Sequence, residues 1–562
     1  LYNLGLALKY QGRYDEAYSR FYKATWNGAW QDAGYLACAQ ISCMRGRYTE
    51  ALYETERSLW RNWHNGTARA LKAALLHRMN RREEALTCCE ESLKIDKFNY
   101  GCLFIKYLLT KHQEVLDQLT VLMHDNAHNY DEIALDFTAA GLWPEAEALW
   151  QVAISRGATT AMTYYYLGWS LLQAGEKERA LQAFETGRGD CPDYVFPNRL
   201  EAVLALQAAI EMQPDDARAN HYLGNLFYDK RQYDLAQSHW ERAAELDPHF
   251  PTTWRNLALV YYNKRQASDK ALECMERAFM LDQTDARILM ELDQLYKKLQ
   301  RPHAERLAFL QRYPQLIAQR DDLVLEEITL LNQTGHYAEA KQKLDSHQFH
   351  PWEGGEGKVP FQYQTARVEL AKQALAEGQY AEAIQLLNEC LHYPHHLGEG
   401  KLYGAQENDF YYLLGVCHKA LGSEEQARSC FEQATLGPTE PAAALYYNDA
   451  KPDKIYYAGL AFRALGQENK ARAYFNRLVD YGKQHLYEKV VMDYFAVSLP
   501  DLQIWDGDLD AANRLHCLYL LALGYAGLGD KVHSERYLAE AERMDINHQG
   551  LQSFRSMLNC LN

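Results

Sequence analysis

The residues best suited to chemistry lie in the second half of the chain, where Gly-Glu-Gly-Lys occurs twice, at residues 355–358 and 398–401. Glycines followed by a lysine are typical of phosphate-binding loops. These two copies lack the GxxxxGK[ST] spacing, no strand pattern precedes them, and Leu402 stands where a hydroxyl residue would be needed. We therefore expect neither a nucleotide nor another cofactor at these loops.

Two carboxylates, Glu356 and Glu399, occupy the same place in the two copies. A pair of carboxyl groups can perform glycoside hydrolysis when a suitable distance separates them. Repetition of one position in neighbouring units could bring the two groups together, but the sequence does not give their separation. A carboxylate-based enzyme is therefore the last-ranked of three functional hypotheses.

Side chains of the types that bind metals occur nearby without a complete ligand set. Asp506 and Asp508 could serve a cation, yet the spacing of a calcium-binding loop is missing. His392, His395 and His396 have no second group of ligands in a sequence that contains neither CxxC nor HExxH. The sequence therefore predicts no metal site.

The four long polar loops of this half, at residues 350–358, 397–409, 446–454 and 493–508, allow two interpretations. In the first, glycine, glutamate and lysine set the loop shapes and pair with one another, while aromatic rings pack the loops onto helices. In the second, the loops line an acid-rich pocket whose aromatic faces and paired hydrogen bonds suit a sugar, a peptide terminus or a basic peptide. The candidate ligand-binding residues of the second interpretation are Trp352, Glu353, Glu356, Lys358, Glu399, Lys401, Gln406, Glu407, Asn408, Asp409, Tyr447, Asn448, Asp449, Asp493, Tyr494, Asp501, Asp506 and Asp508.

The elements that must position these loops follow a 34-residue period. Ala17 recurs 34 residues later as Ala51 and again as Ala85, and the same frame returns with Ala146 and Ala180. Small residues at such positions let two helices cross at about 8–10 Å. A period of this length predicts stacked helix–turn–helix repeats rather than one central core.

In the second half the repeats become longer. The glycines expected in left-handed turns before each second helix are spaced more widely than 34 residues; they are Gly335, Gly378, Gly422, Gly466 and Gly529. The extra residues lie between one repeat and the next, which in a repeat array is often the binding face. A single helix at Leu200–Met212, approached through Pro192 and Pro197, indicates a joint between two arrays.

Composition limits the functional classes. The 562 residues carry a net charge of −16, so a nucleic-acid binder with a basic stripe is not expected. No apolar run reaches the roughly 18 residues that a membrane helix needs. The 12 cysteines form no framework, which favours a reducing compartment and hence the cytoplasm. Because the chain opens at Leu1 inside a helical pattern, we expect an upstream segment.

The chain as a whole resembles tetratricopeptide-repeat (TPR) proteins. The phrases FHPWEGGEGKV, LGEGKLYGAQENDFYYLLG, YYNDAKPDKIYY and DYFAVSLPDL, together with residues 205–236 and 254–264, are similar to a narrower bacterial family. In that family a β-sandwich of galactose-mutarotase type precedes the TPR array. The resemblance implies a cytoplasmic protein with a link to carbohydrate metabolism, and it carries over no catalytic residue. The present chain lacks a β-rich beginning.

Together these observations predict an all-α, right-handed α-solenoid of TPR pairs whose first helices line a concave groove. We expect an N-terminal array at 1–192, a central array at 193–346 and a C-terminal array with expanded loops at 347–562. The leading hypothesis is a non-enzymatic scaffold that binds a protein, a peptide or its own upstream domain. The alternative is a carbohydrate-related module whose loops form part of a ligand pocket, with no role for nucleic acid or membrane in either case.

Overall fold

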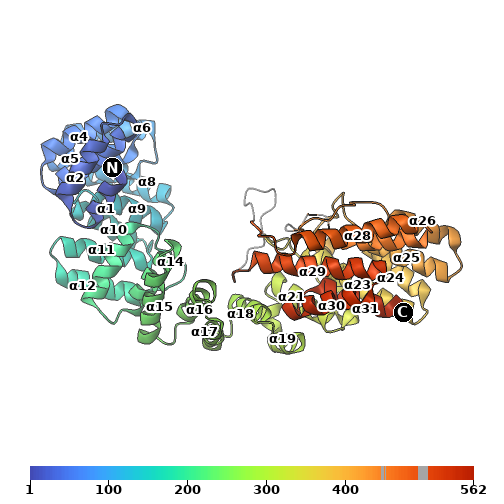
Figure 1. Cartoon of the computed structure of the whole chain (residues 1–562). Coiled ribbons are helices and arrows are strands. Elements are labelled where there is room, and N and C mark those ends of the chain that lie inside the picture. Colours follow the sequence, from blue (N-terminus) through green and yellow to red (C-terminus); the bar gives the residue numbers. More distant parts are fainter. Residues whose placement is uncertain (445–448, 450, 492–503, 562) are drawn as a thin grey trace. The chain divides into compact units, whose positions relative to one another are not determined.

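The computed structural model describes residues 1–444, 449, 451–491 and 504–561. In these residues all regular structure is helical: 31 α-helices, two short 3-10 turns and no strand (Figure 1). The predicted all-α repeat fold is therefore confirmed. The chain divides into two compact units, which we call unit 1 (Leu1–Thr253) and unit 2 (Trp254–Asn562).

Unit 1 contains fifteen α-helices and the beginning of a sixteenth. They are α1 (Tyr2–Tyr10), α2 (Tyr14–Ala24), α3 (Gln31–Met44), α4 (Tyr48–Arg61), α5 (Gly66–Arg78), α6 (Arg82–Ile95), α7 (Tyr100–Thr110), α8 (Gln113–Met123), α9 (Ala127–Thr138), α10 (Trp143–Ser155), α11 (Ala161–Gln173), α12 (Lys177–Gly189), α13 (Leu200–Met212), α14 (Ala217–Asp229), α15 (Tyr233–Leu246) and α16 (Pro251–Arg265), with the 3-10 turn η1 (Gly28–Trp30).

Unit 2 continues from α16 to the last helix. Its elements are α17 (Ser268–Leu281), α18 (Ala286–Lys298), α19 (His303–Leu310), α20 (Pro314–Ile317), α21 (Asp321–Gln333), α22 (Tyr337–Ser346), α23 (Lys358–Ala376), α24 (Tyr380–Cys390), η2 (His395–Leu397), α25 (Asn408–Ala420), α26 (Glu424–Ala434), α27 (Lys454–Ala464), α28 (Glu468–His485), α29 (Leu509–Leu528), α30 (Lys531–Met544) and α31 (Gln549–Leu561).

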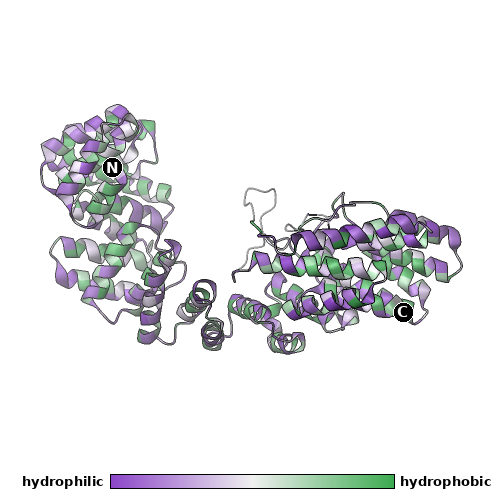
Figure 2. Ribbon diagram, viewed as in Figure 1, coloured by the Kyte–Doolittle hydropathy of each residue, from purple (hydrophilic) through white to green (hydrophobic). Residues whose placement is uncertain are grey.

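Consecutive helices form the predicted pairs because small residues allow them to approach. Ala17, Ala51, Ala85, Ala146 and Ala180 are all 0% exposed at the crossings. Most helices carry both hydrophilic and hydrophobic residues (Figure 2), as expected for elements with one buried face. The predicted turn glycines have left-handed backbones, for example Gly335 at φ +81° and Gly529 at φ +83°.

A glycine in the first helix faces an aromatic ring of the second helix in several repeats. A Cβ atom at these glycines would lie 2.3–2.6 Å from the ring, too close for any larger residue to fit without movement. The two residues are always 16 positions apart. The pairs are Gly5/Phe21, Gly168/Phe184, Gly224/Trp240, Gly415/Phe431 and Gly459/Phe475.

The pairing of helices is interrupted near the predicted joint. Helix α13 has the predicted bounds, no helix lies between α12 and α13, and α13 contacts α11, α14 and the distant helix α1. This joint lies inside unit 1, and the compact units meet instead at Thr253. The division into three arrays at 192 and 346 stays a prediction.

Candidate functional site

In unit 2 the first helices of the repeats are α18, α21, α23, α25, α27 and α29. Helix α31 does not stack as the first helix of a further repeat on α29 and α30. It lies chiefly against α23, with smaller contacts to α29 and α30 (Figure 1). We call the surface that these first helices present to residues 545–557 the inner face of unit 2.

Side-chain amides of the inner face hold the main chain of the segment before α31. Gln300, in the α18–α19 connection, accepts a hydrogen bond from Ile546 N at 2.8 Å and donates one to Asp545 Oδ1 at 3.1 Å. Gln333, at the end of α21, donates to the Asn547 carbonyl oxygen at 2.9 Å. Amides from the end of α21 and from the turn after α18 thus bind one short segment, residues 545–547.

The amide contacts continue on α23. The side chains of Gln362 and Gln549 exchange two hydrogen bonds, of 2.7 and 3.1 Å. Asn332 of α21 donates to Gln362 at 2.9 Å, which fixes the orientation of that amide. The start of α31 is therefore bound by a row of amides rather than by one contact.

A buried ionic cluster supports this row. Arg306 has a fully buried side chain and donates hydrogen bonds to Asp293 at 2.6 Å and to Glu326 at 2.6 Å. It also donates to Asn547 Oδ1 at 3.2 Å. Burial raises the pKa of the Glu326 carboxyl, but Lys297 and Arg306 more than offset this and lower that pKa to about 2. The Glu326 carboxyl is thus ionised, whereas burial raises the pKa of Asp293, and the cluster as a whole positions Asn547.

Helix α31 buries three apolar residues at intervals of three. Leu551, Phe554 and Met557 are 1%, 2% and 0% exposed and belong to the core formed by α23–α29. The Phe554 ring meets Tyr456 of α27 edge to face, with centroids 5.5 Å apart. The remaining described side chains of α31 stay partly or fully exposed, so the helix has one bound face.

Between the apolar residues, two serines bind an ion pair of α23. Lys372 and Glu369 lie 2.8 Å apart and are nearly fully buried. Ser553 Oγ donates to one carboxylate oxygen of Glu369 at 2.8 Å, and Ser556 Oγ donates to the other at 2.5 Å. Lys372 Nζ donates to the Ser553 carbonyl oxygen at 2.9 Å. Both charged groups therefore depend on α31 for part of their hydrogen bonding.

The first two predicted loops lie against each other. Glu399 accepts a hydrogen bond from Gly357 N at 2.7 Å, and Phe349 N donates to the His396 carbonyl oxygen at 2.8 Å. Burial raises the pKa of Glu399, and the charge of Glu356 raises it further. In the first loop Trp352 packs on Gly355, Glu353 and Glu356 are exposed, and Lys358 begins α23.

The second and third loops are also joined by predicted residues. Gln406 accepts a hydrogen bond from Lys451 N at 2.5 Å, and Asp409 forms an ion pair with Lys454. Within the second loop Lys401 pairs with Glu407. Asn408 donates to the carbonyl oxygens of Ala434 and Leu436 at 2.8 and 2.7 Å, which ties α25 to the end of α26.

The end of the fourth loop docks on α16 and α18. Trp505 is 1% exposed, and its Nε1 donates to the Glu291 carbonyl oxygen at 2.9 Å. Asp506 pairs with Lys264 at 2.9 Å, whereas Asp508 caps α29 through Ala511 N at 3.0 Å. The two aspartates therefore have separate structural partners.

The remaining candidates divide in two groups. Asp449 is described and engaged with another residue, whereas five candidates lie outside the described residues: Tyr447, Asn448, Asp493, Tyr494 and Asp501. Because most described loop candidates bond to groups of the chain itself, no described contact favours a sugar. The common ligand pocket stays a prediction. The part of the chain that the structure describes contains no cluster of three His, Cys, Asp or Glu residues arranged for a metal.

Sequence reasoning missed the residues that form the inner face. Gln362 is buried in α23, and a buried amide among mostly apolar neighbours was the available signal. Gln333 is half-buried and Gln300 is exposed, so neither stands out in the sequence. The alternation of apolar residues and serines in α31 was a second signal. Neither marks a site unless the two segments are known to meet.

Polar side chains also link helices of unit 1. Lys9 of α1 donates to Gln40 of α3 at 2.7 Å, and Tyr10 donates to Glu201 of α13 at 2.8 Å. Burial lowers the pKa of Lys9 to about 8, against the opposing charges of Glu201 and Asp136. Helix α13 thus joins the first helices of unit 1 through polar contacts.

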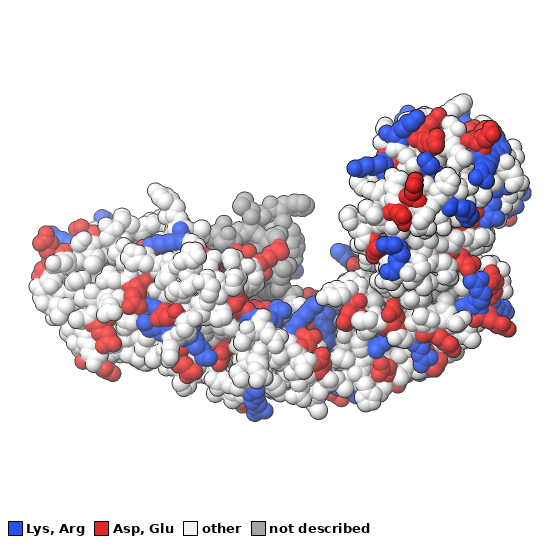
Figure 3. Space-filling model, turned by 180° about the vertical axis from the view of Figure 1, so that it is seen from behind, with Lys and Arg blue, Asp and Glu red and all other residues white. Residues whose placement is uncertain are grey.

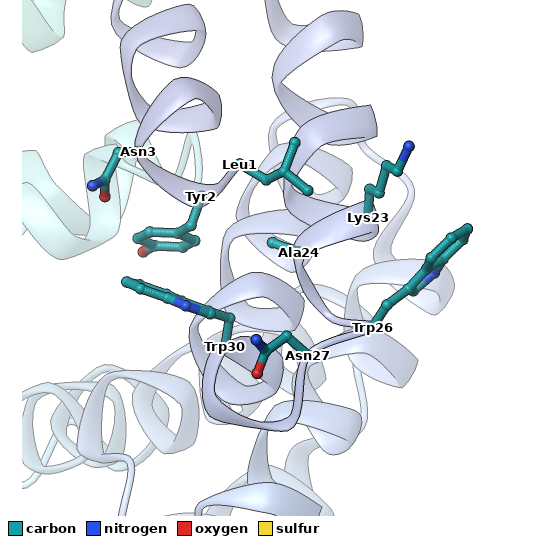
Figure 4. A pocket seen from close by; sticks show the side chains of 8 residues that line it. All are labelled: Leu1, Tyr2, Asn3, Lys23, Ala24, Trp26, Asn27 and Trp30. Atoms are coloured by element: carbon teal, nitrogen blue, oxygen red, sulfur yellow. The ribbon is translucent and has the colours of Figure 1, made fainter.

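A surface pocket of about 450 Å³ lies at the beginning of unit 1 (Figure 4). Tyr2 and Trp30 stack across it with ring centroids 5.0 Å apart, while Trp26 is 75% exposed at its rim. Its remaining lining comes from Leu1, Asn3, Lys23, Ala24 and Asn27. We assign no ligand to this pocket.

The charged surface gives no separate indication of a site. On the face drawn in Figure 3, positive and negative side chains of the described residues are interspersed. Such a mixture suits a solvated surface. None of the described helices is both long and apolar enough to cross a membrane.

These features define a helical-repeat protein with an occupied inner face, and comparison with known families identifies the repeats. Models of the tetratricopeptide repeat match residues 132–194 and 198–236, a further TPR repeat model matches 224–264, and two more tetratricopeptide-repeat models match 409–436 and 455–481. The chain therefore contains TPR repeats in both units. These matches do not concern a β-sandwich, and that part of the resemblance stays a prediction.

Several solved structures are similar in part. YrrB, described as a TPR protein with an unusual peptide-binding site, is 17% identical to this chain. The match covers 42% of this chain and 95% of the YrrB chain, with a TM-score of 0.17. MamA from Desulfovibrio magneticus RS-1 is 18% identical to this chain. The match covers 35% of this chain and 97% of MamA, with a TM-score of 0.21. The matching chain of the APC/C hetero-tetramer Cut9-Hcn1 is 11% identical. The match covers 80% of this chain and 94% of that chain, with a TM-score of 0.26. TM-scores this low carry no argument about ligands or partners.

Proposed function

We propose that the chain is a protein-binding scaffold that docks a partner segment on the inner face of unit 2. One observation carries the proposal: this face already holds residues 545–557 through hydrogen bonds to main-chain atoms and three buried apolar side chains. Hydrogen bonds to the main chain hold a segment of any sequence, while apolar sockets select among sequences.

The same features favour binding without catalysis. The amides and the Glu369–Lys372 pair are fixed by packing and by one another, which suits them to position a segment rather than to exchange protons. We therefore assign the chain no reaction of its own. We also place it in a reducing compartment such as the cytoplasm, because all twelve cysteines are free thiols and most are buried.

A displayed peptide library, selected against the full chain, tests the proposal. Each neutral hydrogen bond contributes about 0.5–1.5 kcal/mol, so Gln333→Ala should weaken selected peptides about two- to tenfold. The exposed Gln182 of α12 supplies a control, and Gln182→Ala should leave the affinities unchanged. Selected peptides that bind the wild type and Gln333→Ala equally well would overturn the assignment of this face.

A further inference from the structure

We infer that α31 is an exchangeable occupant of the inner face, and that the partner is an amphipathic helix of the same chemistry. This rests on the proposed function and specifies its ligand. The bound stretch reads Leu-Gln-Ser-Phe-Arg-Ser-Met over residues 551–557, in which a serine precedes each of the last two apolar residues. A partner helix would carry apolar residues at i, i+3 and i+6 and small hydroxyl residues at i+2 and i+5.

The requirement for small hydroxyl residues follows from the Glu369 carboxylate. Its two oxygens accept from Ser553 and Ser556, one turn apart, at 2.8 and 2.5 Å. Only a short side chain lets the helix main chain come close enough for Lys372 Nζ to reach the Ser553 carbonyl oxygen at 2.9 Å. The inner face therefore discriminates between helices by the size of the residues at the two serine positions as well as by the apolar residues.

Close packing also restricts the residue type at the beginning of the helix. A Cβ atom at Gly550 would lie 3.1 Å from the Tyr519 ring and hydroxyl of α29 and 2.9 Å from His548. A glycine or a slightly shifted small residue is thus needed directly before the first apolar position. This adds a third criterion for the partner sequence.

Exchange is favoured by the polar character of the contacts around the three apolar residues. Gln362, Glu369 and Lys372 bind α31 through groups that water can solvate when the helix leaves. The contacts of α31 with its neighbour α30 include ion pairs of Arg555 with Glu535 and Glu542, whose side chains are 36–60% exposed, and such pairs are weak. A second helix could therefore replace α31 without exposing an unpaired buried charge.

The test uses the full chain and a fluorescent peptide with the sequence of residues 545–560, in which serine replaces Cys560. Phe554→Asp in the full chain should release α31 by placing a charge among apolar groups. The peptide should then bind at least tenfold more tightly to this variant than to the wild type. Asn559→Asp, at an exposed position of the same helix, should behave like the wild type. A Phe554→Asp peptide should not bind the released variant.

If Phe554→Asp fails to fold, hydrogen exchange of the wild type provides a second test. An excess of peptide should speed exchange of residues 549–560 in the chain and leave α23 protected. The inference is overturned if these residues exchange as slowly with peptide as without it, or if a folded, released variant fails to bind the peptide. Neither result bears on whether library peptides depend on Gln333, so the proposed function is judged separately.

Discussion

Replacing Gly168 by leucine tests the contact that repeats most often in this fold. A Cβ atom at position 168 of α11 would lie 2.5 Å from the ring of Phe184 in α12, whereas non-bonded carbon atoms prefer about 3.5–4.0 Å. Phe184 is 0% exposed and also packs against Tyr165, with centroids 6.3 Å apart. The ring therefore has no free space, and Gly168→Leu must push the two helices apart.

The cost follows from two opposing effects. Overpacking of a core costs about 1–3 kcal/mol, whereas leucine returns about 0.8 kcal/mol because glycine is a poor helix former. A whole leucine side chain must be accommodated, so we expect a net loss of about 2 kcal/mol in the free energy of unfolding. For a unit of this size, that loss lowers the melting temperature by about 4–8 °C.

The assay combines a thermal melt with hydrogen exchange of α11 and α12, since stability in a repeat array is local. Gly189→Leu is the matched control, because this glycine ends α12, is exposed and has open space around its Cβ position. It should melt at or above the wild-type temperature. If Gly168→Leu and Gly189→Leu melted together within about 1 °C, close approach at the glycine would not be what sets the helix pairing.

Three further predictions concern other parts of the fold. Trp505→Ala should cost about 3–5 kcal/mol and speed hydrogen exchange in α16 and α18, whereas Tyr403→Ala, at an exposed loop position, should change neither. Arg306→Met should lower the free energy of unfolding, measured by chemical denaturation, by about 3–5 kcal/mol because it leaves buried carboxylates without their partner. Arg555→Met should lower it by only about 0–1 kcal/mol. Burial raises the pKa of the Asp131 carboxyl to about 7. Its protonated form therefore stabilises the fold below about pH 4, and this contribution is lost as the pH rises through 7. Asp131→Asn should raise the free energy of unfolding at pH 8 and leave it nearly unchanged at pH 4, as measured by urea titration at both pH values.

The repeat fold could be predicted because its signals are local and recur. Ala17 and its counterparts mark helix crossings within about twenty residues of their partners, and the turn glycines identify the connections. The same signals located the long loops between repeats correctly. The prediction for the loop side chains was less direct, since the hydrogen bonds of Glu399 and Gln406 are made to main-chain atoms, for which sequence carries no signature.

The position of α31 could not be predicted because it depends on small rotations that accumulate over several repeats. Lys372 and Ser553 are 181 positions apart, and nothing in the sequence of either segment indicates that the two are in contact. In a regular array, the helix after α30 would pack on α29 and extend the stack. Here its apolar residues and serines match α23 better, so the closing contact is decided by chemistry specific to these two helices. A surface that selects one helix over a regular repeat neighbour in this way has the discrimination that a docking face requires.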